Sequence, residues 1–397
     1  ERRPAVLAGR AEARGADVPR FVHDALNAFL GSGILAHGTA RSTCGHGGRD
    51  KRVGLHCKPC GFGPATMGAP QGVGGPRRRP AAGHPLSSMA LSHYLSSDRL
   101  RALAQGQELP AHARGAALFA DICGFTVLTE ALSLRHGERD GVEALTQPVS
   151  GVYDALITEV QRHGGHTLTL AGDAITCWFD QADDEAAGAP APQRAVQAAL
   201  AMQAAMHHLG DPARALALKV GVATGPARRC TVGDARIQTL DVLAGLPVTQ
   251  VALAESLARP GDVMLDVATA QAVCAPVLEW REHAGGRCAV VDSAWQGPLG
   301  PGFDAGLAAP PPVPAPTLRP WVHPFVYERE RAGEGLFATD LRPVVALFLR
   351  FGGLPEELDD DAVQQLDAWI AGAQRVLQHH GGVLLELIMG DKGSYFY

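Results

Sequence analysis

The chain has 397 residues, of which 46% are hydrophobic and 19% are charged, and its formal net charge is -6. This length and composition are typical of a globular protein of two or three domains and exclude a disordered or collagen-like chain. The sequence also has no run of the ~18 apolar residues that a membrane-spanning helix needs. The charge is uneven, because residues 1–90 carry 13 Lys and Arg against 5 Asp and Glu, a balance of +8, so the rest of the chain carries -14 and should not attract nucleic acid.

The N-terminal region, residues 1–84, is rich in Gly, Arg and Pro and shows little periodicity. We expect it to be weakly structured, apart from a helix near residues 19–30 where apolar residues recur at helical spacing. The eight cysteines of the chain show no disulfide-like spacing, so we expect a reducing, cytoplasmic location.

Three cysteines in this region, Cys44, Cys57 and Cys60, suggest a zinc site, because Cys and His at short spacings hold tetrahedral Zn²⁺. The further ligands of such a site are missing, since Gly47, Gly63 and Thr66 stand where a related pattern continues with cysteines. That pattern is the zinc-binding domain of certain insertion-sequence transposases, which this region resembles at Arg20-Phe21-Val22, residues 33–38, Cys44 and Cys57-Lys58. We expect a degenerate remnant that holds no zinc, and its positive charge leaves salt-sensitive nucleic-acid binding as the alternative.

Residues 114–258 carry the alternating signals of a compact α+β domain. A long amphipathic helix ends at Gly164-Gly165, a helix-stop signal, and a tight turn separates two short strands after it. The order strand, helix, hairpin, helix, strand is typical of a ferredoxin-like sandwich. The expected elements are a strand at 116–122, a helix at 142–163, a hairpin of 166–170 and 174–179, a helix at 193–209, a strand at 215–223 and a helix at 248–258.

A Pro-rich segment, residues 298–320, follows this domain and contains eight prolines. Because proline favours extended backbone, we expect a semi-rigid linker. Beyond it, the pattern predicts a strand at 343–351 and a helix at 359–380.

Motifs of the first domain recur after this linker, and an internal repeat indicates duplicated domains. The second copy stops at Tyr397, where its hairpin should turn back, so we expect part of the core to be missing around Leu347, Phe348, Leu366, Trp369, Ile370 and Leu377. The matching segments are Ala117–Asp121 with Ala346–Arg350, Gln161–Gly165 with Gln378–Gly382, and Gly172-Asp173 with Gly390-Asp391.

Two aspartates stand at the ends of neighbouring predicted elements. Asp121 follows a buried apolar strand, and Asp173 lies in the turn of the next hairpin. If these strands are adjacent, both carboxylates can point at one place, and two hard oxygen ligands beside a Gly-containing turn suit Mg²⁺ with a triphosphate. From the spacing alone, Asp121 could equally cap a helix and Asp173 could be an ordinary turn residue.

The sequence around this pair resembles the catalytic domain of class III nucleotidyl cyclases, and the resemblance is strongest to the soluble tandem type. It covers about residues 85–397. The resemblance rests on Leu118–Thr126, Gly164-Gly165 and Gly172-Asp173. It implies a ferredoxin-like α+β fold and the conversion of ATP or GTP into a 3′,5′-cyclic nucleotide and pyrophosphate. The chain then divides into the N-terminal region 1–84, a first cyclase domain 85–296, a Pro-rich linker 297–338 and a truncated second cyclase domain 339–397.

The same resemblance implies roles for individual residues. Asp121 and Asp173, with the backbone carbonyl of Ile122, would hold two Mg²⁺ or Mn²⁺ ions. Lys219 would reach the phosphates, although it could equally be a solvated strand-end lysine. The nucleotide would be bound by Gly124, Phe125, Thr126 and Lys219.

The first copy lacks two groups that the resemblance requires. The Asn and Arg that stabilise the transition state in this family fall on Thr249 and Leu253, and neither can do that electrostatic work. In the second copy, Arg350 stands where a metal-binding Asp would be, and a cation cannot ligate Mg²⁺. We therefore expect the two copies to pair as complementary halves, and the 397-residue fragment alone to be inactive.

The base remains open between adenine and guanine, and we favour ATP. Thr169 stands where a family Lys reads adenine, while Glu386 in the second copy could read guanine or be a plain strand-face carboxylate. The resemblance further implies a C-terminal ATPase-like region that this sequence does not include. Two other functions stay open, a non-catalytic nucleotide-sensing regulatory module and a nucleic-acid-binding protein that uses the basic N-terminus.

Overall fold

The computed structural model describes most of the chain after residue 90 and two short strands before it. The described residues are 39–42, 51–54, 91–124, 127–128, 134–135, 138–171, 173–207, 216–283, 286–298, 304, 312–332, 346–355, 358–389 and 394–397. The predicted helix near 19–30 and the cysteines at 44, 57 and 60 lie outside them. Within residues 1–90, the described strands β1 (Thr39–Ser42) and β2 (Lys51–Gly54) pair antiparallel.

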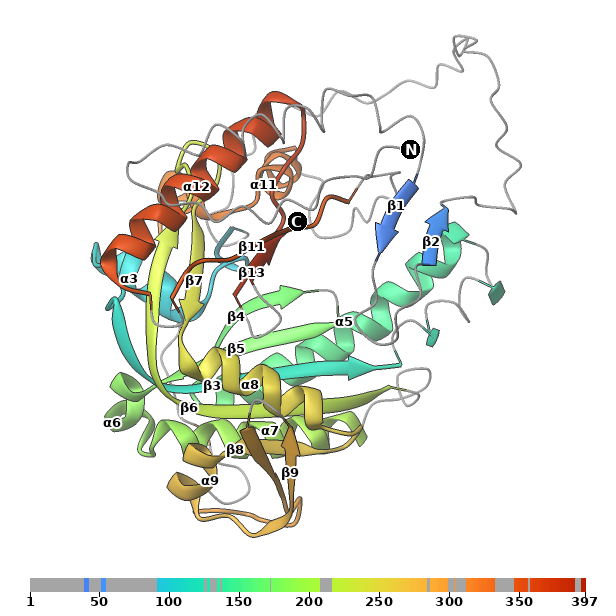
Figure 1. Cartoon of the computed structure of the whole chain (residues 1–397), viewed down its shortest axis with the longest axis vertical. Coiled ribbons are helices and arrows are strands. Elements are labelled where there is room, and N and C mark those ends of the chain that lie inside the picture. Colours follow the sequence, from blue (N-terminus) through green and yellow to red (C-terminus); the bar gives the residue numbers. More distant parts are fainter. Residues whose placement is uncertain are drawn as a thin grey trace.

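A mixed sheet forms the centre of the first copy, and within the described residues it has eight strands (Figure 1). Its order is β4-β5-β3-β6-β8-β10-β9, with β7 paired to β6. Strands β4, β5, β3 and β6 lie side by side in that order, and each neighbouring pair is antiparallel. This is the strand order of a ferredoxin-like fold, so the prediction is confirmed. The strands are β3 (His112–Cys123), β4 (His166–Ala171), β5 (Ala174–Asp180), β6 (Ala217–Val232), β7 (Leu240–Ala244), β8 (Val263–Asp266), β9 (Val277–His283) and β10 (Gly286–Val291).

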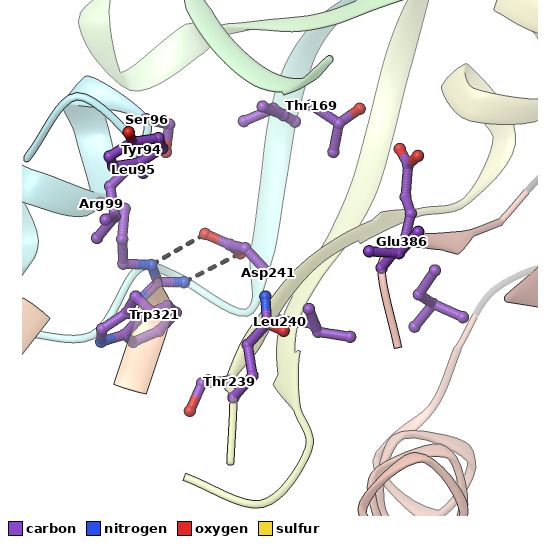
Figure 2. Close-up of a pocket in the computed structure, with 14 residues that line it drawn as sticks. Tyr94, Leu95, Ser96, Arg99, Thr169, Thr239, Leu240, Asp241, Trp321 and Glu386 are labelled. Atoms are coloured by element: carbon purple, nitrogen blue, oxygen red, sulfur yellow. Dashed lines mark hydrogen bonds and ion pairs between the residues drawn. The ribbon is translucent and has the colours of Figure 1, made fainter. Parts of the chain in front are cut away.

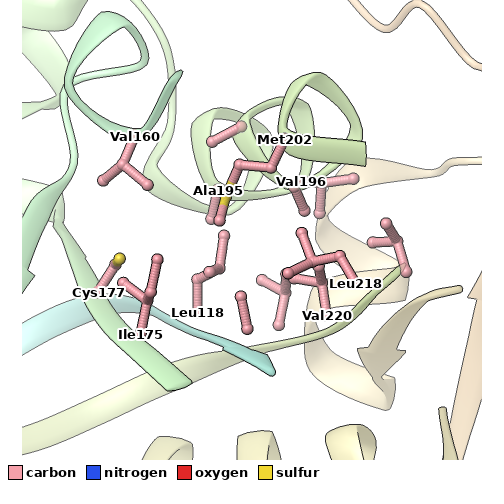
Figure 3. Close-up of a cluster of buried hydrophobic side chains, with 14 of the residues drawn as sticks. Leu118, Val160, Ile175, Cys177, Ala195, Val196, Met202, Leu218 and Val220 are labelled. Carbon is pink, nitrogen blue, oxygen red and sulfur yellow. The ribbon is translucent and has the colours of Figure 1, made fainter. Parts of the chain in front are cut away.

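Helices cover both faces of this sheet. Because side chains alternate along a strand, Leu118 of β3 packs with Val160 of α5 and Met202 of α7 (Figure 3). The next residue towards the N-terminus, Ala117, packs on the other face with Val251 of α8. The Ala-rich sequence of α7 suits this close packing. The helical segments of this copy are α3 (Ser97–Gln105), α5 (Glu138–Arg162), η2 (Gln181–Asp183), α6 (Asp184–Ala187), α7 (Ala191–His207), α8 (Leu246–Leu257) and α9 (Val267–Val273).

Strand β6 is longer than predicted, because it runs through the turn signal Gly225-Pro226 to Val232. Residues 228–232 pair with β7, and this extension of β6 together with β7 forms a hairpin that we call the arm (residues 228–244). Pairing with β7 supplies the hydrogen bonds that a local reading of the sequence could not anticipate.

The second copy repeats the layout of the first. Its described strands order as β11-β13-β12, which matches β3-β5-β4, and its helix α12 corresponds to α5. Both helices end in the same way, since the amide of Gly165 donates to the carbonyl of Val160 at 2.9 Å and the amide of Gly382 donates to that of Leu377 at 2.8 Å. The elements are β11 (Leu349–Phe351), α12 (Asp360–His379), β12 (Leu387–Ile388) and β13 (Ser394–Phe396).

The prediction that apolar residues of the second copy lack part of their core is wrong for Leu366, Ile370 and Leu377, which are at most 6% exposed. They pack in one cluster with Val232 and Val242 of the arm. Figure 1 shows α12 lying across the ends of β6 and β7. The first copy therefore completes the core of the second.

The Pro-rich segment is not extended throughout: within the predicted linker 298–320, residues 315–320 are helical, so the prediction is wrong for them, and a further helix follows at 324–331. Proline is compatible with the first turn of a helix, and it occupies that turn in each of these helices. Leu318 and Val322 are buried against Leu91 and Leu100, so the segment packs against the start of the first copy. The elements are α10 (Ala315–Leu318), η4 (Arg319–Trp321) and α11 (Pro324–Arg331).

A search of the described residues finds no helix with the length and apolar character needed to cross a membrane.

Candidate active site

The structure brings the two predicted aspartates to the same end of the sheet. Asp121 lies near the end of β3, where it faces Ala174, the first residue of β5. Asp173 immediately precedes Ala174, and its carbonyl accepts a 2.9 Å hydrogen bond from the amide of Ile122. Gly172, the other residue of this predicted motif, lies outside the described residues. The hairpin turn is thus tied to the strand that carries Asp121.

Both carboxylates affect the pKa of Tyr153 of α5, a residue outside the motifs that predicted the site. Burial raises the pKa of the Tyr153 phenol, and the negative charges of Asp173 and Asp121 raise it further. Tyr153 therefore lies within electrostatic range of both carboxylates.

Lys219 of β6 reaches this region from the strand next to β3. Its ammonium Nζ lies 3.4 Å from Asp121 Oδ2 and 2.6 Å from Glu255 Oε1 on α8. Burial lowers the pKa of Lys219, but the hydrogen bond with Glu255 and the two carboxylate charges outweigh it and raise the pKa above its ordinary value. Lys219 is therefore a charged group of the site, although the structure gives it carboxylate partners in place of phosphates.

Cys123 borders the same carboxylate, with its Sγ 3.9 Å from Asp121 Oδ2. Burial raises the pKa of this thiol, and the neighbouring Asp121 adds to the effect even though Lys219 opposes it. Cys123 is thus held as a thiol and is a poor nucleophile.

The oxygen atoms of Asp121, Asp173 and the Ile122 carbonyl fit a hard divalent cation that also binds water or phosphate oxygens. Within the described residues there is no group of three or more His, Cys, Asp and Glu side chains placed to hold a metal. Two carboxylates with a nearby backbone carbonyl nevertheless suit Mg²⁺, which usually takes one or two protein carboxylates and completes its shell with water and phosphate oxygens.

The predicted phosphate loop is described only at its start. Gly124 has a φ of 90°, a conformation that L side chains rarely adopt, and its carbonyl accepts a 3.0 Å hydrogen bond from the amide of Leu128. Phe125 and Thr126 lie outside the described residues.

Helix α8 carries the positions of the two missing groups. Leu253 is 6% exposed and packs among Met264, Cys288 and Val290, while Thr249 lies one turn earlier on the same helix. A buried leucine offers neither a charge nor a hydrogen bond to a substrate.

The second copy places Arg350 on β11, exposed and opposite Tyr395 of β13. Asp391, which corresponds to Asp173, lies outside the described residues. The described part of this copy presents a cation at the position where the first copy has Asp121.

A pocket of about 150 Å³ lies between the two copies (Figure 2). Thr169 of β4 and Glu386, which precedes β12, both line it, so the two candidate base-reading positions share one pocket. Burial raises the pKa of Glu386, although its Oε2 accepts a 2.5 Å hydrogen bond from the Tyr397 hydroxyl. Asp241 of the arm also lines the pocket and is held by Arg99 of α3 at 2.9 and 3.1 Å.

Residues 110–283 match the family model of the adenylate and guanylate cyclase catalytic domain. The first copy, which has the ferredoxin-like strand order and both aspartates at one end of the sheet, is therefore a class III cyclase domain.

Two curated proteins are similar to this chain. Adenylate cyclase type 10 of Mus musculus is 26% identical over 153 residues, which is 37% of this chain and 9% of that protein. The protein of the same name from Oryctolagus cuniculus is 26% identical over 153 residues, with the same shares. The match thus spans about a tenth of the length of these relatives.

Solved structures of cyclases are also similar. The adenylyl cyclase CyaB from P. aeruginosa is 20% identical, with 46% of this chain and 95% of that chain covered and a TM-score of 0.38. The guanylate cyclase domain of RhGC from Catenaria anguillulae, in complex with GTP, is 18% identical, with 46% and 98% covered and a TM-score of 0.38.

Proposed function

We propose that the protein is an adenylyl cyclase that converts ATP into 3′,5′-cyclic AMP and pyrophosphate. The observation that carries the proposal is the convergence of Asp121 and Asp173 at one end of the sheet, within a domain of the cyclase family. We propose ATP rather than GTP because both curated relatives are named adenylate cyclases. We further propose a cytoplasmic location, since the cysteines of the described residues are free thiols.

Asp121 and Asp173 would hold two Mg²⁺ or Mn²⁺ ions, with the carbonyl of Ile122 as a further ligand. Bound in this way, such ions lower the pKa of the ribose 3′-hydroxyl and neutralise charge on the triphosphate. The hydrogen bond from Ile122 to the Asp173 carbonyl keeps the turn in place beside β3. The Lys219 ammonium adds positive charge beside the triphosphate, and the backbone of Gly124–Thr126 donates N–H groups to it.

The reaction needs a partner domain. The 3′-oxygen displaces pyrophosphate from the α-phosphorus, and charge develops on the transferred group as the bond breaks. Thr249 and Leu253 cannot stabilise that charge, so we propose that a second cyclase domain supplies an Asn and an Arg, and that the 397-residue chain alone has little activity. The contact between α12 and the arm supports pairing of the two copies.

The test is product formation by this chain combined with a complete second cyclase domain, with ATP or GTP and Mn²⁺. Cyclic AMP should form from ATP, and Asp121→Ala and Asp173→Ala should abolish it, whereas the exposed control Asp154→Ala on α5 should not. Cyclic GMP as the main product would refute the choice of base. Nucleotide binding without turnover would favour the regulatory module instead.

A further inference from the structure

Lys219 and Asp121 are directly opposite each other on neighbouring antiparallel strands. Opposite residues share one face of a sheet with their Cβ atoms about 4.5–5.5 Å apart, so an opposite-charge pair at these positions forms readily. The 3.4 Å distance from Lys219 Nζ to Asp121 Oδ2 is the result. An ammonium on this oxygen competes with any divalent cation for the same lone pairs.

A third group draws the ammonium away from Asp121. Glu255 comes from α8, a different element, and its Oε1 lies 2.6 Å from Lys219 Nζ, clearly closer than the Asp121 oxygen. The Glu255 side chain is 13% exposed, against 23% for Lys219 and 26% for Asp121. The stronger and less solvated contact of Lys219 is therefore the one with Glu255.

The position of Glu255 is fixed by backbone packing. Gly221 lies two residues after Lys219 on β6, and a Cβ at this glycine would come within 2.6 Å of the Val251 carbonyl oxygen and 2.9 Å of the Glu255 amide nitrogen. Helix α8 thus rests directly on β6 at a point where only glycine fits. The Glu255 carboxylate is held beside Lys219 by this contact between helix and strand.

We propose that Glu255 is a positioning residue that draws the Lys219 ammonium towards itself, weakens its ion pair with Asp121 and so leaves the Asp121 carboxylate more available to a divalent cation. The inference rests on the proposed function, because it takes Asp121 as a metal ligand. Glu255 acts through Lys219 and has no need to touch the cation or the nucleotide.

The experiment measures Mn²⁺ binding to the full 397-residue chain without nucleotide, from the electron paramagnetic resonance signal of free Mn²⁺. Glu255→Gln should weaken binding about three- to tenfold, the size expected when a partly screened charge shifts at this range. Lys219→Met should strengthen binding by a similar factor, which a misfolded protein cannot do. Glu279→Gln on β9 makes the same charge change at a different ion pair and should leave binding unchanged.

The double variant identifies the route of the effect. If Glu255 acts through Lys219, Glu255→Gln should have no effect on Mn²⁺ binding once Lys219→Met is present. An equal weakening with and without Lys219 would show that Glu255 attracts the ion by its own charge, and unchanged binding in the single Glu255→Gln variant would also overturn the inference. Binding that survives Asp121→Ala would overturn the metal assignment and the inference with it, whereas binding that is lost in Asp121→Ala but unchanged in Glu255→Gln would overturn the inference alone.

Discussion

The two copies share a topology but differ in what completes them. In both, a strand, a helix and a hairpin are arranged in the order β3-β5-β4 or β11-β13-β12, and the helix ends in the same glycine motif. The first copy closes its core with its own helices α5 and α7, whereas the second uses Val232, Val242 and Ala244 of the arm. The shared topology thus follows from short local motifs. Whether each copy has a complete core of its own depends on residues that are distant in the sequence.

The copies also differ in charge at one equivalent strand position. Asp121 in the first copy lies among Lys219, Cys123 and Asp173, while Arg350 in the second is exposed. The residue at this one position therefore decides whether a copy offers a carboxylate ligand or a positive charge. Five predictions test how far this difference between the copies extends.

The largest effect should follow loss of the carboxylates. In the chain combined with a complete partner domain, Asp121→Ala and Asp173→Ala should each lower the rate of cyclic nucleotide formation by at least about 10²–10³-fold, the loss typical for one transition-state electrostatic group. Asp391→Ala should cost far less, because Arg350 already prevents metal binding in that copy. Equal losses would assign a metal site to both copies.

The next effect concerns α3, the first helix of the first copy. Asp98 of α3 is buried and paired with Arg229 of the arm. Asp98→Asn removes one of the two carboxylates that the buried Arg229 guanidinium contacts, the other being Asp241, and should lower the free energy of unfolding at pH 7 by up to about 3–5 kcal/mol. Urea unfolding measures this, and a loss under about 1 kcal/mol would mean that α3 does not brace the first copy.

The same pair predicts a pH dependence. Burial would raise the pKa of Asp98, but the charges of His166 and Arg229, with hydrogen bonds from Ser96 and Arg229, lower it well below its usual range. The stability from this carboxylate is present above its unfolded pKa of about 3.9 and is lost as the pH falls towards the folded pKa. The gap in unfolding free energy between the wild type and Asp98→Asn should therefore narrow below about pH 4. A gap that widens in acid would reverse the sign of the shift.

A smaller and local effect should follow from emptying the shared core. Ile370 of α12 is fully buried, so Ile370→Ala should destabilise the second copy by about 2–5 kcal/mol. Hydrogen exchange should become faster in the amides of α12 and stay unchanged in α5. Equal acceleration in both helices would show that the copies unfold as one cooperative unit.

The smallest effect should come from Phe348, which precedes β11 and is 64% exposed. Phe348→Ala should change the free energy of unfolding by no more than about 0.5 kcal/mol, as for most surface substitutions. The same urea experiment measures it. A loss close to that of Ile370→Ala would indicate that Phe348 is covered in solution.

The sequence predicted the parts of the fold that depend on local signals. The hairpin before Asp180 and the helix end at Gly164 lie within about two residues of their expected places, because glycine turns and apolar periodicity act over a few residues. The placement of Asp121 and Asp173 at the same end of the sheet followed from the same strand and turn signals.

The parts that the sequence could not predict depend on contacts between distant residues. Glu255 and Tyr153 join the site only because α8 and α5 pack on the sheet, and neither stands in a recognisable local motif. The helices at 315–331 form against Leu91 and Leu100, more than 200 positions away in the sequence, so the prolines alone suggested an extended chain.

The arm has a practical consequence for anyone who wishes to produce the first cyclase domain by itself. Val232, Val242 and Ala244 belong to its fold, yet α12 of the second copy covers them. In a shortened protein that ends before α12, these apolar side chains would be exposed to water. The protein would then self-associate through this apolar surface. Polar substitutions at Val232 and Val242 would be needed to keep such a protein monomeric, and the same substitutions would prevent the second copy from docking.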